Sequence, residues 1–426
     1  MNACTFRLRF LPIMAFLTLA LISGCSSTPV NKNTPQDPIV NQSVDPPQEV
    51  EFTKNVKQLI AQVAQTQQIP LELIVNGFTD VKAIPSIRKL VLPPSSTFKK
   101  NWVAYRGRFI EPIRLQAGRA FFQEHREFLT QTQENSGIPA ELIVAIIGIE
   151  TIYGRQLGNF RVKDVLTTLA FDYPDTPNRN TREALFKDQL KELILMCWTQ
   201  SGGSLPGQNT TQGIDTVFFN SCLNQNSSYA GAIGLPQFMP GSIRKYAVDG
   251  DGDGQIDLRK NPKDAIASVA HFLQNHGWQT GMPIYFNIQA DAIPKAQLLA
   301  DGQPALKYSI DELIQQGILQ GPQGDLMQGG VEPQSKALIV DLPYVNKAGD
   351  TQVRYLVGLN NFLTIVQYNR SYFYAQSVAE FAEALGYKNV GIVPGSATAI
   401  PEKSIGIKKP KAKPKNSKPK KLKPAI

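Results

Sequence analysis

The sequence predicts a mainly α-helical protein with a small α+β insertion in its C-terminal third. Val56, Leu59, Ile60 and Val63 recur at helical spacing, and an unbroken apolar run covers 142–149. After Gly281, short segments rich in β-branched and aromatic residues replace the helical pattern. The chain has 426 residues, of which 42% are hydrophobic, and this is enough for one or two sizeable cores.

The first 24 residues have the pattern of a secretory signal peptide. Arg7 and Arg9 precede an apolar stretch over 10–22, which is too short to span a bilayer. Small residues then lead to Cys25, as in a lipoprotein cleavage site, so we expect the thiol of Cys25 to carry a lipid. Ser26 follows it, where an Asp would favour inner-membrane retention. The predicted location is therefore the periplasmic face of the outer membrane of a Gram-negative bacterium.

A polar segment rich in Pro, Asn, Gln and Asp follows the anchor and is expected to be a tether. Helical patterns then dominate, and strand patterns come after Gly281. Helices are expected over 56–63, 113–129, 139–154, 182–198, 262–276 and 377–385, and strands over 283–288, 337–342 and part of 353–365.

Composition changes divide the chain into seven parts. They are a signal peptide (1–24), a lipid anchor and tether (25–50), a helical domain (51–135), a core region with an acidic loop (136–280), a β-containing insertion (281–352), a return of the core with a C-terminal helix (353–400) and a Lys/Pro tail (401–426).

The carboxyl group of Glu150 is the strongest candidate for chemistry. It directly follows the apolar run 142–149, and apolar neighbours raise the pKa of a carboxyl group, as a general acid requires. Pro139 suits the first turn of this helix and Gly154 its C-terminal cap, which places Glu150 in the last turn. There the helix dipole also disfavours a carboxylate. The alternative is that Glu150 reaches solvent or pairs with Arg155.

Four cysteines are present, and Cys4 and Cys25 belong to the N-terminal region already described. The remaining two, Cys197 and Cys222, flank a stretch rich in Gly, Ser, Asn and Thr. An oxidising periplasm favours a structural disulfide between them, and the absence of a C-x-x-C motif argues against a redox role. Two buried free thiols remain the alternative.

The positive charge is concentrated at the C-terminus. The chain has a formal net charge of +9, but the ten Lys residues from Lys403 onward, without an acid among them, leave the rest at −1. This Lys/Pro tail cannot build a core, and we expect it to be disordered and to adhere weakly, in a salt-sensitive way, to anionic envelope polymers or lipid headgroups. A solvated tail without a partner is the alternative. Nucleic acid is not an expected partner of a lipid-anchored protein, and we expect a monomer without an organic cofactor.

A short acidic segment has the ligand spacing of an EF-hand loop. Asp249, Asp251 and Asp253 would supply side-chain oxygens and Gln255 its backbone carbonyl. Three acids this close repel one another without a cation, so we expect structural Ca²⁺ here. Position twelve is Lys260 instead of the usual Glu. A metal-free acidic turn is the alternative.

Three further segments carry small, amide and aromatic side chains that suit sugar binding. They are 102–109 (WVAYRGRF), 228–240 (SYAGAIGLPQFMP) and 368–374 (YNRSYFY). Together with 150–154 (ETIYG), in this order and spacing, they resemble the lysozyme-like lytic transglycosylases of bacterial cell walls, and most closely the membrane-bound B family. The resemblance covers about residues 51–387. The chain has no H-E-x-x-H, G-x-S-x-G or G-x-x-x-x-G-K motif that would favour another enzyme class.

The resemblance implies a lysozyme-like catalytic core with a flanking helical domain. It also implies cleavage of the β-1,4 bond between N-acetylmuramic acid and N-acetylglucosamine in peptidoglycan glycan strands, with 1,6-anhydromuramic acid ends. Glu150 would be the single catalytic acid and base. Asp264 would close the metal loop, one residue later than the family pattern. The implied substrate-binding residues are Tyr105, Ser228, Gln237, Tyr368, Asn369 and Tyr374.

Two other functions are compatible with these motifs. A hydrolytic muramidase would add water and leave reducing ends. A non-catalytic lipoprotein would bind peptidoglycan without cleaving it. The intact motifs around Glu150, Gln237 and Asn369 argue against the second of these.

Overall fold

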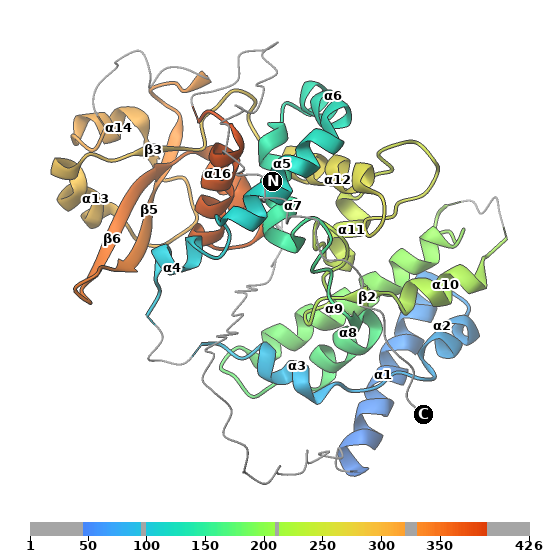
Figure 1. The fold of residues 1–426 in the computed structure, drawn as a ribbon. Coiled ribbons are helices and arrows are strands. Elements are labelled where there is room, and N and C mark those ends of the chain that lie inside the picture. Colours follow the sequence, from blue (N-terminus) through green and yellow to red (C-terminus); the bar gives the residue numbers. More distant parts are fainter. Residues whose placement is uncertain (1–45, 95–98, 209–212, 320–329, 390–426) are drawn as a thin grey trace, which may run out of the picture.

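The computed structural model describes residues 46–94, 99–208, 213–319 and 330–389 (Figure 1). The predicted signal peptide, the lipid site at Cys25 and the Lys/Pro tail lie outside these residues. Within the described ranges, no helix combines the length and apolar character needed to cross a bilayer.

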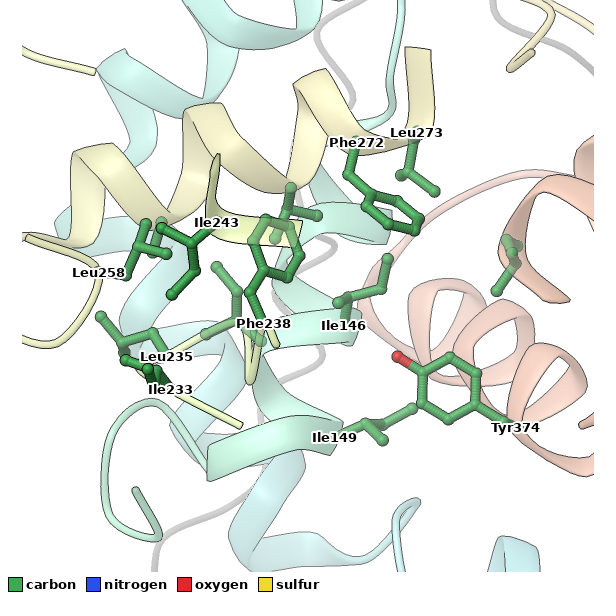
Figure 2. Packing of buried hydrophobic residues seen from close by; sticks show 14 of the residues in the cluster. Ile146, Ile149, Ile233, Leu235, Phe238, Ile243, Leu258, Phe272, Leu273 and Tyr374 are labelled. Carbon is green, nitrogen blue, oxygen red and sulfur yellow. The ribbon is translucent and has the colours of Figure 1, made fainter. Parts of the chain in front are cut away.

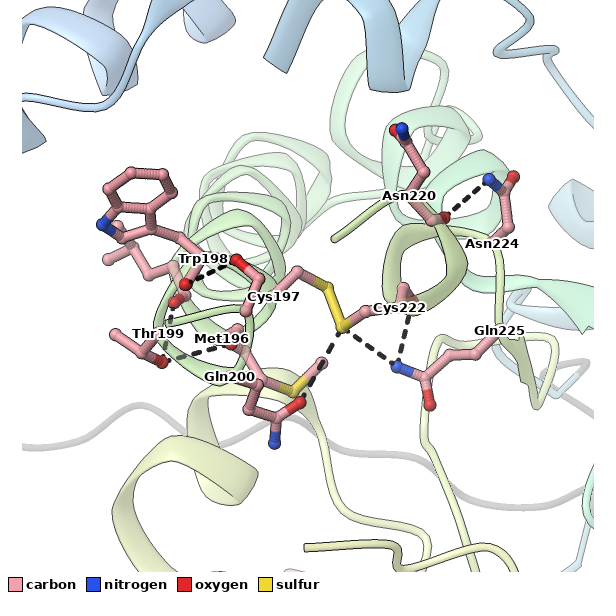
Figure 3. Close-up of a disulfide and its surroundings, with 11 residues drawn as sticks. Met196, Cys197, Trp198, Thr199, Gln200, Asn220, Cys222, Asn224 and Gln225 are labelled. Carbon is pink, nitrogen blue, oxygen red and sulfur yellow. Dashed lines mark hydrogen bonds between the residues drawn. A yellow bond between two sulfur atoms is a disulfide. The ribbon is translucent and has the colours of Figure 1, made fainter. Parts of the chain in front are cut away.

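One group of helices occupies the lower part of Figure 1. α1 packs on α2, α8 and α9, while α10 packs on both α2 and α9. The predicted disulfide is present and joins the last turns of α9 and α10 through Cys197 and Cys222, whose Cα atoms are 5.5 Å apart (Figure 3). The group comprises α1 (Pro46–Gln67), α2 (Leu71–Phe78), α3 (Pro85–Leu90), α8 (Val162–Phe171), α9 (Arg179–Gln200) and α10 (Thr216–Leu223).

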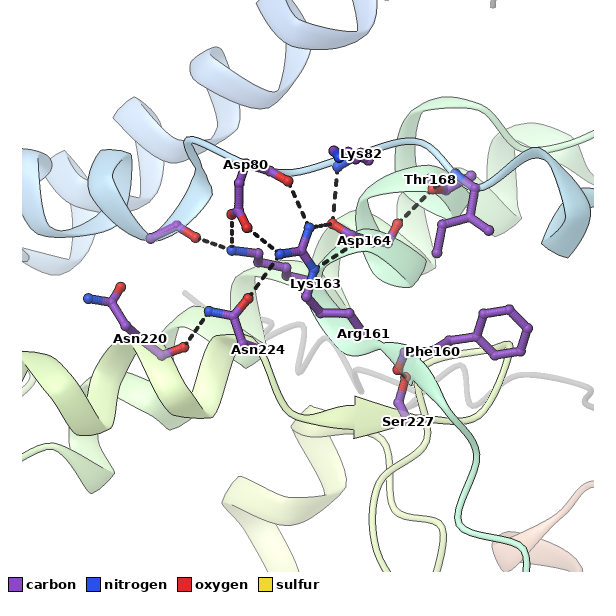
Figure 4. Close-up of polar contacts among 12 residues, drawn as sticks. Asp80, Lys82, Phe160, Arg161, Lys163, Asp164, Thr168, Asn220, Asn224 and Ser227 are labelled. Atoms are coloured by element: carbon purple, nitrogen blue, oxygen red, sulfur yellow. Dashed lines mark hydrogen bonds and ion pairs between the residues drawn. The ribbon is translucent and has the colours of Figure 1, made fainter. Parts of the chain in front are cut away.

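A partly buried ion-pair cluster holds the turn after α2 to the start of α8 (Figure 4). The Lys163 ammonium is 1% exposed and donates to the Gly77 carbonyl and to Asp80 Oδ1, each at 2.6 Å. Arg161 bridges Asp80 and Asp164. Hydrogen bonds from Lys163 and Arg161 lower the pKa of Asp80 to about 2. These contacts fix the start of α8, where β1 (Phe160–Arg161) pairs with β2 (Asn226–Ser227).

The second group surrounds the apolar helix α7 (Ala140–Thr151). Eleven of the side chains of α7 are buried, because α5, α6, α12 and α16 all pack against it. This is why its sequence is apolar on every face instead of amphipathic. The other members are α4 (Trp102–Arg106), α5 (Pro112–Glu124), α6 (Arg126–Ser136), α12 (Pro262–Asn275), α15 (Asn360–Tyr368) and α16 (Tyr372–Leu385). α11 (Pro240–Tyr246) packs on both α9 and α12 and so connects the two groups.

A small antiparallel sheet forms the upper left of Figure 1. Its order is β3 (Tyr285–Asn287), β6 (Thr351–Gly358), β5 (Lys336–Val345) and β4 (Tyr308–Ser309). Three short helices accompany it: η1 (Ala290–Ala292), α13 (Ile293–Leu299) and α14 (Ile310–Gln315). A second hydrophobic cluster, with members between Met282 and Leu359, is separate from the main core. One face of the sheet therefore has its own core, while Leu338, Val340 and Leu356 on the other face belong to the main core.

The mainly helical class and the small β-containing part are confirmed, with local differences. The helix expected over 113–129 is divided at His125 into α5 and α6. The segment 353–365 is strand only up to Gly358, and α15 begins at Asn360. The segment 51–135 is shared between the two helical groups, since α1 to α3 pack with α8 to α10 while α5 and α6 pack with α7.

Candidate active site

Glu150 lies in the last turn of α7, as the sequence predicts, and its side chain is only partly exposed. Tyr374 of α16 donates a hydrogen bond of 2.7 Å to Glu150 Oε1. Figure 2 shows the Tyr374 hydroxyl directed toward α7, where Ile146 and Ile149 pack in the same apolar cluster. A carboxyl group in this environment has one strong donor and little water.

Burial raises the pKa of Glu150 from 4.5 to about 7. The hydrogen bond from Tyr374 and the positive charge of Arg114 act in the opposite direction and lower it. The balance leaves Glu150 able both to give and to accept a proton near neutral pH. Arg155, the ion-pair partner considered above, is exposed and is not among the groups that perturb the pKa of Glu150 in the described residues.

The turn after α7 differs from the expected glycine cap. Ile152 (φ 50°) is the left-handed C-cap, and Tyr153 (φ 56°) and Gly154 (φ 88°) continue in the same region of conformation. A β-branched residue in this region is strained. The Thr151 hydroxyl donates to the Leu235 carbonyl at 3.1 Å and ties the turn to the loop that contains Gln237.

Aromatic residues from the C-terminal helices α15 and α16 lie around Glu150. The rings of Tyr368 and Tyr374 stack with centroids 6.1 Å apart, and Tyr368 donates to the Pro236 carbonyl at 2.6 Å. Burial raises the pKa of both phenols, and the charge of Glu150 raises it further, so both hydroxyls remain donors. Asn369 directly follows α15 in extended conformation.

Tyr105 of α4, together with Tyr368 and Tyr374, forms the aromatic wall of the site. Its ring lies 5.1 Å from that of Phe109 and 5.4 Å from that of Phe373. Burial, followed by the charge of Glu150, raises the pKa of Tyr105. Its packing on Phe373, the neighbour of Tyr374 in α16, places Tyr105 beside the other aromatic residues of the site.

Ser228 and Gln237 make their hydrogen bonds inside their own loop. Ser228 Oγ accepts from the Ala232 N–H at 3.1 Å, and Gln237 donates from Nε2 to the Gly234 carbonyl at 2.9 Å. Gln237 also has a left-handed backbone, with φ 49°. Among the described residues neither makes a hydrogen bond to Glu150, whose hydrogen-bond partner is Tyr374. Their predicted substrate contacts stay predictions, but they do not orient Glu150 through a direct bond.

Two residues at the site were missed by the sequence reasoning. Arg114 is buried and donates from Nη1 to the carbonyls of Gly148 and Ile149 at 2.6 and 3.0 Å. Tyr153 packs its hydroxyl between Gly118 and Gly148. No motif signals Arg114, because its partners lie 34 and 35 residues along the chain. Tyr153 lies within the segment 150–154 that carries the resemblance, but nothing local indicates that its hydroxyl packs between two glycines.

The acidic loop brings together three of its five predicted ligands. Carboxylate oxygens of Asp249, Asp251 and Asp264 lie within 4.8 Å of one another. Asp264 is completely buried, and burial together with the charges of Asp251 and Asp249 raises its pKa. Asp253 is outside this group, and its Oδ1 accepts from the Gln255 N–H at 2.8 Å. A compact triad of hard oxygen donors suits a divalent cation such as Ca²⁺.

Comparison with known proteins places this site in a family. Residues 51–383 match the transglycosylase SLT domain, which is well over half of the chain. The chain belongs to the transglycosylase SLT family. This confirms the predicted lysozyme-like, mainly helical fold.

Relatives within the SLT family include both curated proteins and solved structures. The chain is 32% identical to membrane-bound lytic murein transglycosylase B of Escherichia coli K12, over 79% of this chain and 84% of the relative. It is 33% identical to the soluble lytic transglycosylase SltB1 of Pseudomonas aeruginosa, with a TM-score of 0.62 and coverage of 78% and 97%. The E. coli lytic transglycosylase Slt35 in complex with calcium is 30% identical, with a TM-score of 0.60 and coverage of 78% and 92%. The chain is thus homologous to lytic murein transglycosylases.

Proposed function

We propose that this protein cleaves the β-1,4 bond between N-acetylmuramic acid and N-acetylglucosamine in peptidoglycan and leaves 1,6-anhydromuramic acid ends. The observation that carries the proposal is Glu150, a half-buried carboxyl group whose pKa is raised to about 7 and which is bonded to Tyr374. The membership of the SLT family supports the same reaction.

In the first step, protonated Glu150 donates its proton to the glycosidic oxygen. The bond from that oxygen to the anomeric carbon of the muramic acid breaks, and the N-acetylglucosamine leaves with a free 4-hydroxyl. Glu150 is then a carboxylate. The hydrogen bond from Tyr374 and the charge of Arg114 favour this form, so both lower the cost of proton donation.

In the second step, the carboxylate of Glu150 takes the proton from the O6 hydroxyl of the same muramic acid. O6 attacks its own anomeric carbon and closes the 1,6-anhydro ring, and Glu150 regains its proton. No water is consumed. The N-acetyl carbonyl of the substrate can stabilise the anomeric carbon between the two steps.

The use of one carboxyl group distinguishes this site from ordinary glycosidases, which place two carboxyl groups about the scissile bond. Among the described residues, the groups that perturb the pKa of Glu150 are Tyr374 and Arg114. A phenol with a raised pKa and a guanidinium tune this acid, and neither is a second carboxyl group. We further propose that the sugar rings contact Tyr105, Ser228, Gln237, Tyr368, Asn369 and Tyr374.

The reaction is tested by digesting purified peptidoglycan sacculi and analysing the products by mass spectrometry. We expect anhydromuramic ends from the wild type, none from Glu150→Gln, and normal release from the control Glu124→Gln, whose side chain is 73% exposed. Reducing ends would identify a hydrolytic muramidase instead. Tight binding without release would identify a non-catalytic peptidoglycan-binding protein.

We also propose that Asp249, Asp251, Asp253 and Asp264, with the Gln255 carbonyl, bind Ca²⁺. Support comes from the spacing of the loop, from the close approach of three carboxylates, and from the relative whose structure is in complex with calcium. The ion would neutralise the repulsion among these acids and brace the loop before α12.

We propose in addition that lipid on Cys25 anchors the protein to the periplasmic face of the outer membrane, while its Lys/Pro tail adheres to anionic envelope polymers. The SLT-family relative of E. coli is named as membrane-bound, which supports the anchor. Cys25→Ala should move the protein from the outer-membrane fraction to the soluble fraction. Retention of that variant in the membrane fraction would contradict the lipid anchor.

A further inference from the structure

The end of the catalytic helix rests on a buried arginine from another helix. Arg114 of α5 is 8% exposed, and its Nη1 donates to the carbonyls of Gly148 and Ile149. These carbonyls belong to the last turn of α7, where the helix dipole is negative. The Gly148 carbonyl also accepts the N–H of Ile152 at 3.1 Å, so Arg114 is its second donor. Glu150 is the next residue. We propose that Arg114 is a positioning residue, which holds the last turn of α7 and places a positive charge behind Glu150.

Burial lowers the pKa of Arg114, while the charge of Glu111 raises it, and an arginine guanidinium stays charged in proteins. Its nearest carboxylate, Glu111, lies 4.0 Å from Arg114 Nε. Both Glu111 oxygens already cap the start of α5, where they accept from the N–H groups of Ile113 and Arg114 at 2.7 Å. On its other side the guanidinium lies 5.3 Å from the centre of the Phe109 ring. The guanidinium is therefore held by two backbone carbonyls and a ring, with a loose ion pair.

The helix packing leaves room for this arrangement. Gly118 lies one turn after Arg114 on α5 and faces α7, and Tyr153 fills the space between Gly118 and Gly148. A Cβ atom at Gly118 would lie 2.5 Å from the Tyr153 hydroxyl. The two helices thus approach closely enough for Arg114 to reach the carbonyls of α7.

The titratable groups around Glu150 are few. Tyr105 faces it from α4, Arg114 from α5, Tyr368 from α15 and Tyr374 from α16. Helices α6 and α12 also pack on α7 but contribute no such group among the described residues. The charge of Arg114 lowers the pKa of Glu150, and the phenols are neutral at the working pH. Arg114 is therefore the one positive charge in this set.

This inference rests on the proposed role of Glu150 and deepens it. Glu150 must carry a proton to begin the reaction. The alkaline limb of the pH profile of kcat/KM, where the rate falls as the pH rises, therefore reports the ionisation of Glu150. Removal of the Arg114 charge should move that limb to higher pH, by about half a unit or more. A purely structural role would lower activity at all pH values and leave the limb in place.

The experiment compares three variants on purified sacculi across pH 4 to 10. Arg114→Gln keeps an N–H donor for the carbonyls but loses the charge, and we expect its limb to shift upward. Arg114→Lys keeps the charge, and we expect a limb near that of the wild type. Arg155→Met removes an exposed charge five residues after Glu150 and should leave the limb unchanged.

An unshifted limb in Arg114→Gln, or an equal shift in Arg114→Lys, would overturn the inference. Thermal melting of each variant verifies that the fold is retained, and if Arg114→Gln does not fold, the shift is measured on Arg114→Met in the same way. The proposed function is tested separately by Glu150→Gln and by the product analysis, so either idea can fail without the other.

Discussion

The Tyr374 hydroxyl donates to Glu150 Oε1 at 2.7 Å, although the two residues are 224 positions apart in the chain. Tyr374 is 2% exposed, and its ring stacks on Tyr368. The hydrogen bond favours the carboxylate, while burial favours the protonated acid. The pKa of Glu150 is therefore set by two opposing effects, and mutation can change each effect separately.

Tyr374→Phe should slow the reaction and move its pH profile. Without the hydrogen bond the pKa of Glu150 rises above about 7, so the alkaline limb moves to higher pH. The carboxylate formed after proton donation also loses a charge-assisted bond, which corresponds to about a ten- to hundredfold loss of kcat. The measurement is the rate of muropeptide release from sacculi as a function of pH.

Tyr368→Phe is the matched control for that experiment. Its hydroxyl bonds to the Pro236 carbonyl and not to Glu150. The variant can lose rate, but its alkaline limb should coincide with that of the wild type. An equal displacement of the limb in both variants would mean that general loosening of the aromatic wall, and not the bond to Glu150, sets the pH profile.

Glu150→Gln should stabilise the protein at alkaline pH. The pKa of Glu150 is about 7 in the folded state and near 4.5 in the unfolded chain, so only the folded state holds this proton between those values. The folded state therefore loses stability as the pH rises from 4.5 to 7, by at most about 3 kcal/mol for a partly exposed group. Below pH 4.5 the effect is absent.

Thermal melting at pH 4.5 and pH 8 measures this effect. The melting temperature of Glu150→Gln should exceed that of the wild type by a few degrees at pH 8 and match it at pH 4.5. Glu124→Gln, at an exposed position, should show no such difference. Equal melting temperatures of wild type and Glu150→Gln at both pH values would show that the carboxylate is not disfavoured by the fold.

Gly148→Ala should destabilise the catalytic helix. A Cβ atom at this position would lie 2.3 Å from the Tyr153 hydroxyl and 2.8 Å from the Phe381 ring, so the turn after α7 must move. Such overpacking costs about 1–3 kcal/mol, and the displaced end of α7 should also reduce activity. Gly213→Ala, where a new Cβ atom meets no atom within 4 Å, is the control for chemical denaturation.

The helices and the acid were accessible to sequence reasoning because both depend on local pattern. The apolar run 142–149 predicts the buried helix α7, and Glu150 directly follows that run, one residue before the helix ends at Thr151. The residues that tune Glu150 were not accessible in this way. Arg114 acts through carbonyls of Gly148 and Ile149, which belong to a helix that no local spacing connects to α5.

The turn after α7 shows the limit of propensity. Glycine is the residue type typical of a helix C-cap, so the sequence predicts the cap at Gly154. In the structure the left-handed C-cap residue is Ile152. Tertiary contacts account for this, because Thr151 is held by the Leu235 carbonyl and Tyr153 is held between two glycines. Local preference favoured Gly154, and packing overrode it.

Ca²⁺ should raise the melting temperature of the wild type relative to EDTA, and Mg²⁺ should do so less. The carboxylates of Asp249, Asp251 and Asp264 repel one another when metal is absent, and binding at a hundredfold excess over Kd corresponds to about 2.7 kcal/mol. Asp264→Asn should remove most of the Ca²⁺ effect. Asp253→Asn tests whether an acid outside the triad is also a ligand, and Asp291→Asn, at an exposed position, is the control. Identical melting in Ca²⁺ and EDTA would exclude the site.

Reduction of the Cys197–Cys222 disulfide should destabilise the lower helical group without changing the chemistry. The bond closes a loop of 25 residues between α9 and α10, and its loss releases chain entropy worth about 3 kcal/mol in the unfolded state. Both sulfurs are buried and belong to helices other than α7, so kcat on sacculi at moderate temperature should be retained by the double variant Cys197→Ser/Cys222→Ser. The check is guanidinium unfolding of the wild type with and without reductant beside the double variant. A loss of activity that precedes unfolding would connect α9 and α10 to the site at Glu150, contrary to this expectation.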